Sequence, residues 1–198
     1  MTCIVAVRNK HRGTVILGAD SRRSLNGGFI TTTLPDDRGK IFRFNDHFLI
    51  GHTGAGKIRH YTSKIHIPFG RLGPRRALNL EDTVLEYIIP SLKRTARSYE
   101  MLETDKGVPN LDGQILIAFA DEVCLIGNDF CVTPITGDFF SVGSGMYFAL
   151  GAFHAMNALQ VKPSVQAKYA LTAASALTES VGPPFSFMET TPRKKLKK

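Results

Sequence analysis

The sequence has no long apolar run, no export signal and few cysteines. None of its apolar runs reaches about 18 residues, the length that indicates a membrane-spanning helix. The N-terminus carries no basic segment followed by an apolar stretch, so we expect no secretory signal. Cys3, Cys124 and Cys131 are odd in number, and their spacing matches no zinc-binding pattern. We therefore expect three buried, reduced thiols in a cytoplasmic protein, with no membrane partner and no metal site.

Length and charge indicate one globular domain with a short basic tail. A chain of 198 residues can bury a sizeable core, and we expect a single domain over residues 1–191. The net charge is +8, and residues 192–198 contribute five lysine or arginine residues to it and no acid. Such a run is usually solvated, so we expect residues 192–198 to be disordered. No nucleic-acid-binding motif accompanies this charge, and nucleic acid is not an expected partner.

Hydrophobic patterning predicts short strands joined by tight turns. We expect strands over residues 4–7, 14–18, 29–33, 40–44, 47–50, 115–120, 123–127, 139–142 and 185–188. Turn signals fall at residues 26–28 and 35–39, and residues 103–113 are expected to form a polar loop. The strands come as consecutive hairpins, which predicts antiparallel sheets.

Helical patterns occur in two pairs between the groups of strands. We expect helices over residues 55–67, from an Asn79 cap with a kink or boundary at Pro90, over residues 147–155 and over residues 163–177. This order favours an α+β fold in which two antiparallel sheets pack together with helices outside. It argues against alternating βαβ units.

The glycine-rich stretch Gly51–Lys57 has two functional interpretations. It matches the first seven positions of the phosphate-binding motif G-x-x-x-x-G-K-[ST], between an expected strand and an expected helix. However, Ile58 stands at the eighth position, where serine or threonine would bind Mg²⁺. A P-loop nucleotide-binding protein remains an alternative, as does a simple glycine turn. In the other interpretation, the Gly51 N–H is a backbone donor to an oxyanion.

Thr2 is a candidate nucleophile. Removal of Met1 would leave a threonine with a free α-amine at the start of an apolar strand. An amine beside a hydroxyl can act as its base. The α-amino pKa of model peptides, about 7.7–8.0, is close to neutral pH, so a modest shift would keep this amine in its basic form.

Five stretches resemble, in sequence order, the proteasome β-subunit and HslV-like family of N-terminal-nucleophile (Ntn) hydrolases, in its bacterial form. They are Thr2–Val7, Gly18–Arg22, Gly39–Ile41, Ile50–Gly54 and Val142–Gly145. The resemblance extends over residues 2 to about 182. It implies a four-layer αββα sandwich of two antiparallel sheets flanked by helix pairs, which agrees with the order of elements predicted above.

The resemblance also implies roles for individual residues. Thr2 would be both nucleophile and base, and Lys40 would lie beside it as a cation that lowers the pKa of the amine. Asp20 would pair with Lys40, and the Gly51 N–H would be the oxyanion donor. Ser144 would hydrogen-bond near the amine and relay protons. Arg22, His52 and Thr53 are the expected substrate-binding residues.

The implied function is that of a threonine peptidase subunit in a homo-oligomeric, HslV-like ring. The implied substrate is a peptide or an unfolded protein, an ATPase or other regulator is a possible partner, and the chemistry needs no metal or organic cofactor. The ordinary removal of Met1 would suffice, with no propeptide.

One stretch departs from the family pattern, which places an aspartate and then a serine before the last strand. Here that stretch is Leu177–Pro184, and either Glu179 or Ser180 could substitute. This departure leaves two further alternatives on the same scaffold, a non-peptidase amidohydrolase and an inactive ring subunit.

Overall fold

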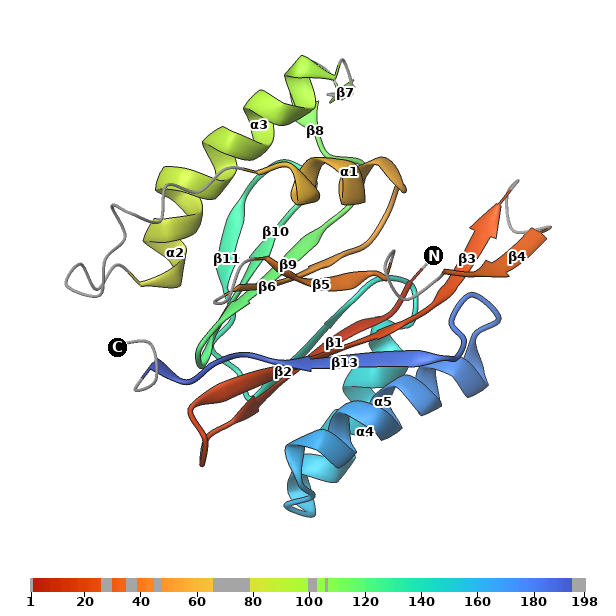
Figure 1. Ribbon diagram of the computed structural model, residues 1–198. Coiled ribbons are helices and arrows are strands. Elements are labelled where there is room, and N and C mark those ends of the chain that lie inside the picture. The colour runs from red at the N-terminus through yellow and green to blue at the C-terminus, as the bar shows by residue number, and fades with distance from the viewer. Residues whose placement is uncertain are drawn as a thin grey trace.

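A computed structural model describes residues 2–25, 30–34, 39–44, 48–65, 79–99, 103–105 and 107–193 of the chain. The turns expected at 26–28 and 35–39 lie wholly or mostly outside these residues. The same holds for the end of the helix expected over 55–67 and for most of the tail expected over 192–198. Figure 1 shows two sheets in the middle of the described chain, with helices on both outer sides.

The first sheet is four-stranded and antiparallel. In order, its strands are β12 (Phe139–Val142), β1 (Ile4–Asn9), β2 (Thr14–Asp20) and β13 (Phe185–Glu189). The strand expected at 185–188 is therefore present, at an edge of the sheet. Ile4 pairs with Val142 on one side and with Ala19 on the other. This register brings the start of the chain beside Asp20 and beside the residues that follow β12.

The second sheet is five-stranded, and all its neighbouring strands are antiparallel. In order, its strands are β11 (Val132–Pro134), β10 (Glu122–Ile126), β9 (Ile115–Phe119), β6 (Phe48–His52) and β5 (Ile41–Phe44). Both predicted hairpins of this sheet are present, and the prediction of antiparallel sheets is confirmed. The short strand β11 was not expected, because its three residues are too few to show an apolar alternation.

Two small hairpins extend from the sheets. They are formed by β3 (Arg22–Leu25) with β4 (Ile30–Thr33), and by β7 (Glu103–Asp105) with β8 (Val108–Asn110). The polar loop expected over residues 103–113 is therefore wrong in part. Strand β4 lies within the strand expected over residues 29–33, whereas β3, β7 and β8 were not expected, because their mostly polar residues show no apolar period.

Helices cover the outer face of each sheet. They are α1 (Lys57–Ser63), α2 (Leu80–Thr83), the π-helical segment η4 (Val84–Ile88), α3 (Ile89–Ser98), α4 (Met146–Ala158) and α5 (Pro163–Leu177). One buried cluster joins α4 and α5 to the four-stranded sheet, and another joins α1 to α3 with the five-stranded sheet. A third cluster, which includes Ile4, Leu17, Leu49 and Leu116, lies between the two sheets (Figure 1).

The long second helix is capped by Asn79 and becomes irregular before Pro90, as its sequence predicts. The Asn79 side chain accepts a hydrogen bond from the Asp82 N–H at 2.7 Å, which caps the helix. Near Pro90 the helix widens, since the Ile89 N–H bonds to the Val84 carbonyl five residues back. Proline has no N–H, and its ring clashes with the carbonyl four residues before it. A wider turn directly before Pro90 allows the helix to continue without a break.

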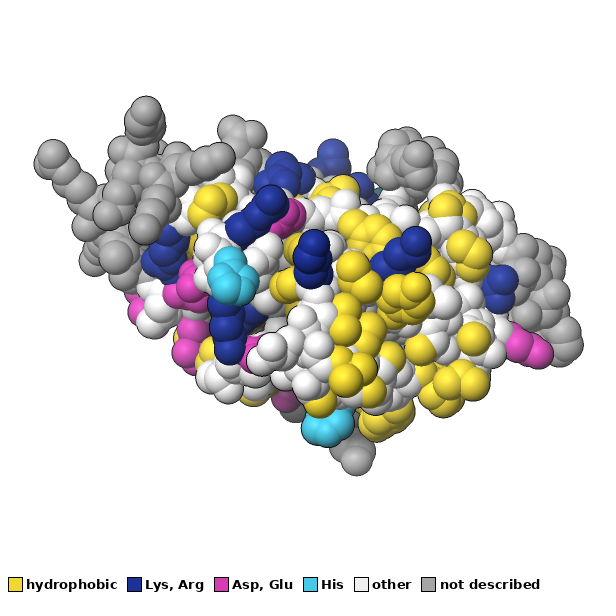
Figure 2. Space-filling model, turned by 90° about the horizontal axis from the view of Figure 1, so that it is seen from below, with side chains coloured by type: hydrophobic (Ala, Val, Ile, Leu, Met, Phe, Trp, Pro, Cys, Tyr) yellow, Lys and Arg dark blue, Asp and Glu magenta, His cyan; other side chains and the backbone are white. Residues whose placement is uncertain are grey.

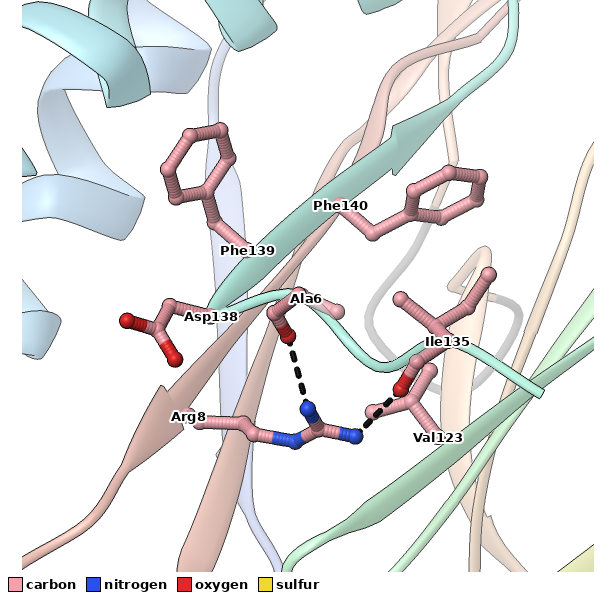
Figure 3. A pocket seen from close by; sticks show the side chains of 8 residues that line it. Ala6, Arg8, Val123, Ile135, Asp138, Phe139 and Phe140 are labelled. Atoms are coloured by element: carbon pink, nitrogen blue, oxygen red, sulfur yellow. Dashed lines mark hydrogen bonds between the residues drawn. The ribbon is translucent and has the colours of Figure 1, made fainter.

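Arg8 anchors the segment between β11 and β12. Its guanidinium donates hydrogen bonds to the carbonyl oxygens of Asp121 (2.9 Å), Thr136 (2.6 Å) and Gly137 (2.8 Å), and also to that of Ile135. Figure 3 shows the guanidinium lying in the hollow formed by this segment. These bonds hold the chain that leads into β12 against β1, and thereby set the position of the residues after β12.

The structure also bears on two expectations drawn from composition. Cys3 and Cys124 are buried, but Cys131 is exposed, so the expectation of three buried thiols is wrong for Cys131. Cys131 lies in the turn between β10 and β11, where its backbone bonds to Gly127 and to the Asp129 side chain while its own side chain is exposed. Among the described helices, none combines the length and the apolarity needed to cross a membrane.

Candidate active site

The Asp20 carboxylate is the centre of a buried polar cluster at the end of β2. One of its oxygens accepts the Cys3 N–H at 2.9 Å and the Lys40 ammonium at 2.7 Å. The other accepts the backbone N–H groups of Arg22 at 3.1 Å and Gly182 at 3.3 Å. The carboxylate therefore receives four donors from four separate parts of the chain. It holds Lys40 beside the residue that directly follows Thr2.

Lys40 lies just before β5, and its side chain is almost fully buried. Besides Asp20, its ammonium donates to the Arg22 carbonyl oxygen at 2.5 Å. Burial lowers the pKa of Lys40 from its ordinary value, and the charge and hydrogen bond of Asp20 act in the opposite direction. Since Asp20 and the Arg22 carbonyl both accept from the ammonium, we take the group to be charged at neutral pH.

Thr2 is buried between the start of β1 and the turn that follows β12. Its backbone nitrogen donates to the Ser144 hydroxyl oxygen at 3.2 Å. Its carbonyl oxygen lies 3.3 Å from the Ser144 hydroxyl and accepts the Gly145 N–H at 3.3 Å. Gly143 has a φ of +94°, and a Cβ at this position would lie 2.2 Å from the Thr2 carbonyl oxygen. A glycine is therefore required for the turn to approach Thr2 this closely.

A chain of hydroxyl groups extends from Thr2 into the segment after α5. The Ser144 hydroxyl lies 2.9 Å from that of Ser180, which lies 2.8 Å from that of Thr178. Glu179 is exposed, and its backbone carbonyl oxygen accepts a bond from the Arg22 guanidinium at 2.5 Å. Of the two residues that the sequence left open, the structure brings Ser180 to the site. The contacts that reach Ser144 from this segment are therefore hydroxyl contacts.

Gly51 is explained by packing between the sheets. A Cβ there would lie 3.1 Å from the Ile4 side chain, so glycine allows the sheets to approach. The Thr53 N–H donates to Gln114 in the ladder toward β9 at 2.9 Å, and Gly51 pairs with Leu116 in the same register. Bonding direction repeats at every second residue of an antiparallel strand, so the Gly51 N–H points toward β9 within the sheet. This direction does not support the oxyanion role expected for Gly51.

The three expected substrate-binding residues have different surroundings. The Arg22 guanidinium is directed to the segment 179–182, where a Cβ on Gly182 would lie 2.5 Å from its Nε. His52 and Thr53 are buried at the end of β6. The His52 backbone N–H donates to the Lys40 carbonyl at 3.0 Å, so His52 adjoins the site through the main chain.

His52 is a neutral histidine in an enclosed position. Burial, followed by the positive charges of Arg59 and Lys40, lowers its pKa to about 3. A hydrogen bond to the Gly39 backbone opposes this shift. Its Nε2 atom is buried and has no hydrogen-bond partner among the described residues.

The phosphate-binding interpretation of Gly51–Lys57 finds little support in the structure. Strand β6 has antiparallel neighbours on both sides, whereas P-loops join strands and helices of parallel α/β sheets. Ile58, at the position of the Mg²⁺-binding hydroxyl, is fully buried in the core. The Lys57 ammonium lies 3.8 Å from the Asp112 carboxylate.

Thus the structure brings together four of the five expected catalytic residues, Thr2, Asp20, Lys40 and Ser144. Sequence reasoning missed Thr178 and Gly182, and it did not choose between Glu179 and Ser180. The sequence did contain a signal for Thr178, which is a threonine at the end of a predicted helix and two residues before a serine. Threonines in such positions often accept a hydrogen bond from a nearby backbone N–H, as Thr178 does from Ser180.

Comparisons with known proteins show similarity at the level of structure. No family model matches the chain, and no curated protein matches it in sequence. A solved structure of BPH from Thiobacillus denitrificans covers 96% of this chain and 97% of its own, with a TM-score of 0.75 and 19% identity. A structure of the same protein in complex with epoxomicin has a TM-score of 0.73 and 18% identity, and covers 96% of this chain and 98% of its own.

A second solved neighbour is a eukaryotic HslV from Trypanosoma brucei. It has a TM-score of 0.64 and 20% identity, and covers 94% of this chain and 98% of its own. Both similarities extend over nearly the whole of each chain. The chain therefore has a proteasome-like fold with mixed helices and antiparallel sheets.

Proposed function

We propose that this chain is a threonine-type endopeptidase, an Ntn hydrolase in which Thr2 becomes the nucleophile once Met1 has been removed. The observation that carries the proposal is the Asp20 carboxylate oxygen that binds both the Cys3 N–H and the Lys40 ammonium. It fixes a buried cation next to Thr2, within a proteasome-like fold. We further propose that the arrangement of the layers is the αββα sandwich of that enzyme class.

The proposed reaction uses two groups of Thr2. The free α-amine takes the proton of the hydroxyl, whose oxygen attacks the carbonyl carbon of a peptide bond. The amine then gives this proton to the leaving nitrogen, which leaves an ester on Thr2. A water molecule, deprotonated by the same amine, hydrolyses the ester and restores the enzyme.

The surrounding groups favour these proton transfers. The positive charge of Lys40 lowers the pKa of a nearby amine, which keeps a larger fraction of it in the basic form. The Ser144 hydroxyl already bonds to the nitrogen that becomes this amine, at 3.2 Å. Ser144 therefore orients the amine, and Ser180 orients Ser144.

The oxyanion donor is proposed to lie in the segment that directly follows β6. The N–H groups of Thr53 and Ala55 donate toward the segment before β9, whereas that of His52 donates toward Lys40. Gly54 lies between Thr53 and Ala55, is exposed, and has a φ of +90°. We assign the oxyanion contact to the Gly54 amide in place of Gly51, because the Gly51 N–H is directed into the sheet whereas Gly54 is exposed just after β6.

The remaining parts of the proposal concern assembly and substrate. By its fold, the chain is proposed to form a homo-oligomeric, HslV-like ring in the cytoplasm, and to act on peptides or unfolded proteins. Arg22, His52 and Thr53 remain the proposed substrate-binding residues, and Arg22 and His52 adjoin the site through their backbone bonds to Asp20 and Lys40. An ATPase or other regulator that feeds substrate to the ring is proposed as a partner.

The deciding experiment combines the mass of the mature N-terminus with peptide hydrolysis. We expect a mass without Met1, turnover of an unfolded protein, and loss of turnover in Thr2→Ala. A matched control is Thr172→Ala, an exposed threonine of α5 that bonds only within its own helix. Unchanged turnover in Thr2→Ala would disprove the role of Thr2, and retention of Met1 would indicate an inactive subunit. Hydrolysis of small amides without hydrolysis of proteins would favour an amidohydrolase.

Epoxomicin provides an independent probe, since it is bound in one of the solved BPH structures. We expect it to raise the melting temperature of the mature chain and to have no such effect on Thr2→Ala. A similar increase for both forms would place its binding site away from Thr2.

A further inference from the structure

The side chain of Lys40 is held at its charged end by two acceptors from another part of the chain. Its ammonium donates to the Asp20 carboxylate at 2.7 Å and to the Arg22 carbonyl oxygen at 2.5 Å. A lysine carries its ammonium on a flexible four-carbon stem, so these two bonds do not fix the main chain from which the stem extends. The position of the main chain at Lys40 therefore depends on further contacts.

His52, at the end of β6, supplies two of these contacts. Its backbone N–H donates to the Lys40 carbonyl oxygen at 3.0 Å. Its imidazole is hydrogen-bonded to the backbone of Gly39, the residue before Lys40. Since the Nε2 atom has no hydrogen-bond partner among the described residues, the bond to Gly39 is made by Nδ1. One residue therefore binds two consecutive residues of the segment that leads into β5.

The imidazole of His52 is the donor in its bond to Gly39. This bond favours the protonated form of the ring, which is the effect of a backbone carbonyl that accepts from it. Burial, together with the charged or titratable groups around the ring, Lys40, Arg59 and His60, disfavours a second proton. The ring is therefore neutral at pH 7, with its one proton on Nδ1. It can hold the Gly39 carbonyl oxygen without adding a positive charge next to Lys40.

The imidazole lies on the side of the five-stranded sheet that faces the helices. Side chains alternate along a strand. The Ile50 side chain belongs to the cluster under α1 and α3, whereas a Cβ on Gly51 would meet Ile4 between the sheets. His52 therefore has the orientation of Ile50, toward the helix layer that contains α1 (Figure 1). From this side the ring binds Gly39 without occupying the space between the sheets.

The setting of His52 differs from that of a surface histidine. Histidine side chains lie exposed on the face of the molecule shown in Figure 2, whereas His52 is only 7% exposed. Burial of a polar ring costs free energy where one of its nitrogen atoms has no hydrogen-bond partner. An apolar side chain of similar size would fill the same space without this cost. The bond to Gly39 therefore accounts for a histidine at this position better than packing does.

We propose that His52 is a positioning residue for Lys40. By binding the carbonyl oxygens of Gly39 and Lys40, it fixes the main chain from which Lys40 reaches Asp20, and it thereby keeps the ammonium beside Thr2. This role rests on the proposed function, in which the charge of Lys40 lowers the pKa of the Thr2 amine. The energy between two charges depends on their separation, so a displaced ammonium would leave the amine with a higher pKa. A smaller fraction of the amine would then be in its basic form at neutral pH.

The test is the pKa of the Thr2 amine, measured by NMR titration of the chain prepared without Met1. His52→Leu and His52→Phe both remove the ring N–H, whereas the side-chain amide in His52→Asn can place an N–H near the position of Nδ1. We expect the two apolar variants to raise the amine pKa by about 0.5–1 pH unit and His52→Asn to leave it near the wild-type value. The matched control is His60→Leu, which removes an exposed histidine of α1 and should leave the amine pKa unchanged.

Lys40→Met gives the reference for the largest expected rise, because it removes the charge itself. Circular dichroism melting shows which variants are folded, and either apolar variant of His52 is sufficient for the comparison. An unchanged amine pKa in the apolar variants, with a raised one in Lys40→Met, would overturn the positioning role alone. An equal rise in His60→Leu would also overturn it. An unchanged amine pKa in Lys40→Met would overturn both this role and the proposed role of Lys40 in catalysis.

Peptide hydrolysis separates the remaining outcomes. If the amine pKa rises as expected but the wild type hydrolyses no protein, the peptidase function fails while the positioning role of His52 holds. If His52→Leu instead raises KM and leaves the amine pKa at the wild-type value, the ring binds substrate and does not position Lys40. A lowered kcat/KM at low pH that recovers at higher pH, without a change in KM, is the result expected of the positioning role.

Discussion

The Asp20 carboxylate and the Lys40 ammonium lie 2.7 Å apart, with side chains that are 0% and 5% exposed. Removal of Lys40 would leave a buried carboxylate without its counter-charge. We expect Lys40→Met to lower the free energy of unfolding by about 3–5 kcal/mol, as measured by urea denaturation at pH 7. The same variant is expected to lose peptide hydrolysis, because no cation then remains beside Thr2.

The chain offers a matched control for this pair. Lys10 and Asp138 are 2.8 Å apart, but their side chains are 71% and 38% exposed. Solvent screens such a pair, so Lys10→Met should change stability by less than about 1 kcal/mol. Equal effects of the two substitutions would contradict a special role for Asp20 and Lys40.

The hydroxyl chain behind Thr2 leads to a second prediction. Ser144→Ala removes the acceptor of the Thr2 nitrogen and should lower kcat about 100-fold, at the lower end of what proton-transfer groups contribute. Ser180→Ala leaves Ser144 in place but without its partner, and we expect about a tenfold loss, equivalent to one weakened hydrogen bond of about 1.4 kcal/mol. Steady-state hydrolysis of a fluorogenic peptide measures both values.

Ser98 provides the control for these serines, since its exposed hydroxyl bonds only to a carbonyl of its own helix. Ser98→Ala should therefore have wild-type kinetics. If Ser180→Ala also had wild-type kinetics, Ser180 would be a helix-end residue without influence on the site.

Gly143 and Gly13 allow backbone strain to be separated from contact with Thr2. Both have positive φ angles, +94° and +62°. A Cβ at Gly143 would lie 2.2 Å from the Thr2 carbonyl oxygen, whereas a Cβ at Gly13 has nothing within 4 Å. Alanine at either position should cost about 1–2 kcal/mol through its strained backbone. Only Gly143→Ala should also abolish hydrolysis; if it retained activity at wild-type levels, a close approach to Thr2 would not be required.

His52 makes the folded state sensitive to acid. Its pKa is about 3 in the folded chain and 6.5 in its ordinary state, so between these values the unfolded chain binds the additional proton. Stability from this residue therefore falls as the pH falls below about 6.5, by about 1.4 kcal/mol per pH unit. We expect His52→Gln to remove part of the difference between unfolding free energies measured at pH 7 and pH 5.

The control for His52 is His11, which is exposed in the turn between β1 and β2. His11→Gln should leave the pH dependence of unfolding unchanged. If the unfolding free energy of His52→Gln depended on pH as it does in the wild type, the lowered pKa of His52 would be contradicted.

Local patterns were sufficient to predict most of the fold and part of the site. Apart from β11, alternating and continuous apolar runs identified the strands of both sheets, and Asn79 and Pro90 marked the start and the irregular turn of the long helix. The strands β7 and β8 were missed because their polar residues show no apolar period. Thr2, Asp20, Lys40 and Ser144 were selected from a shared family pattern, and the structure brings them together.

The remaining features of the site depend on tertiary geometry. The direction of the Gly51 N–H is set by the register between β6 and β9. The sequence does not indicate this direction, because glycine has no side chain whose polarity would show which face of the sheet it occupies. The choice between Glu179 and Ser180 depends on how the chain leaves α5, and a shift of one residue exchanges their positions. The sequence therefore predicted which residues belong to the site better than it predicted their hydrogen-bond partners.

The bond between Thr2 and Ser144 has a consequence for the order of maturation and folding. The Thr2 backbone nitrogen donates to Ser144, which lies 142 residues later in the chain and follows β12. This nitrogen becomes the catalytic amine in the proposed mechanism, so the amine is oriented only after β12 has paired with β1. A chain that has lost Met1 but has not yet folded would therefore carry a free amine without an ordered site around it.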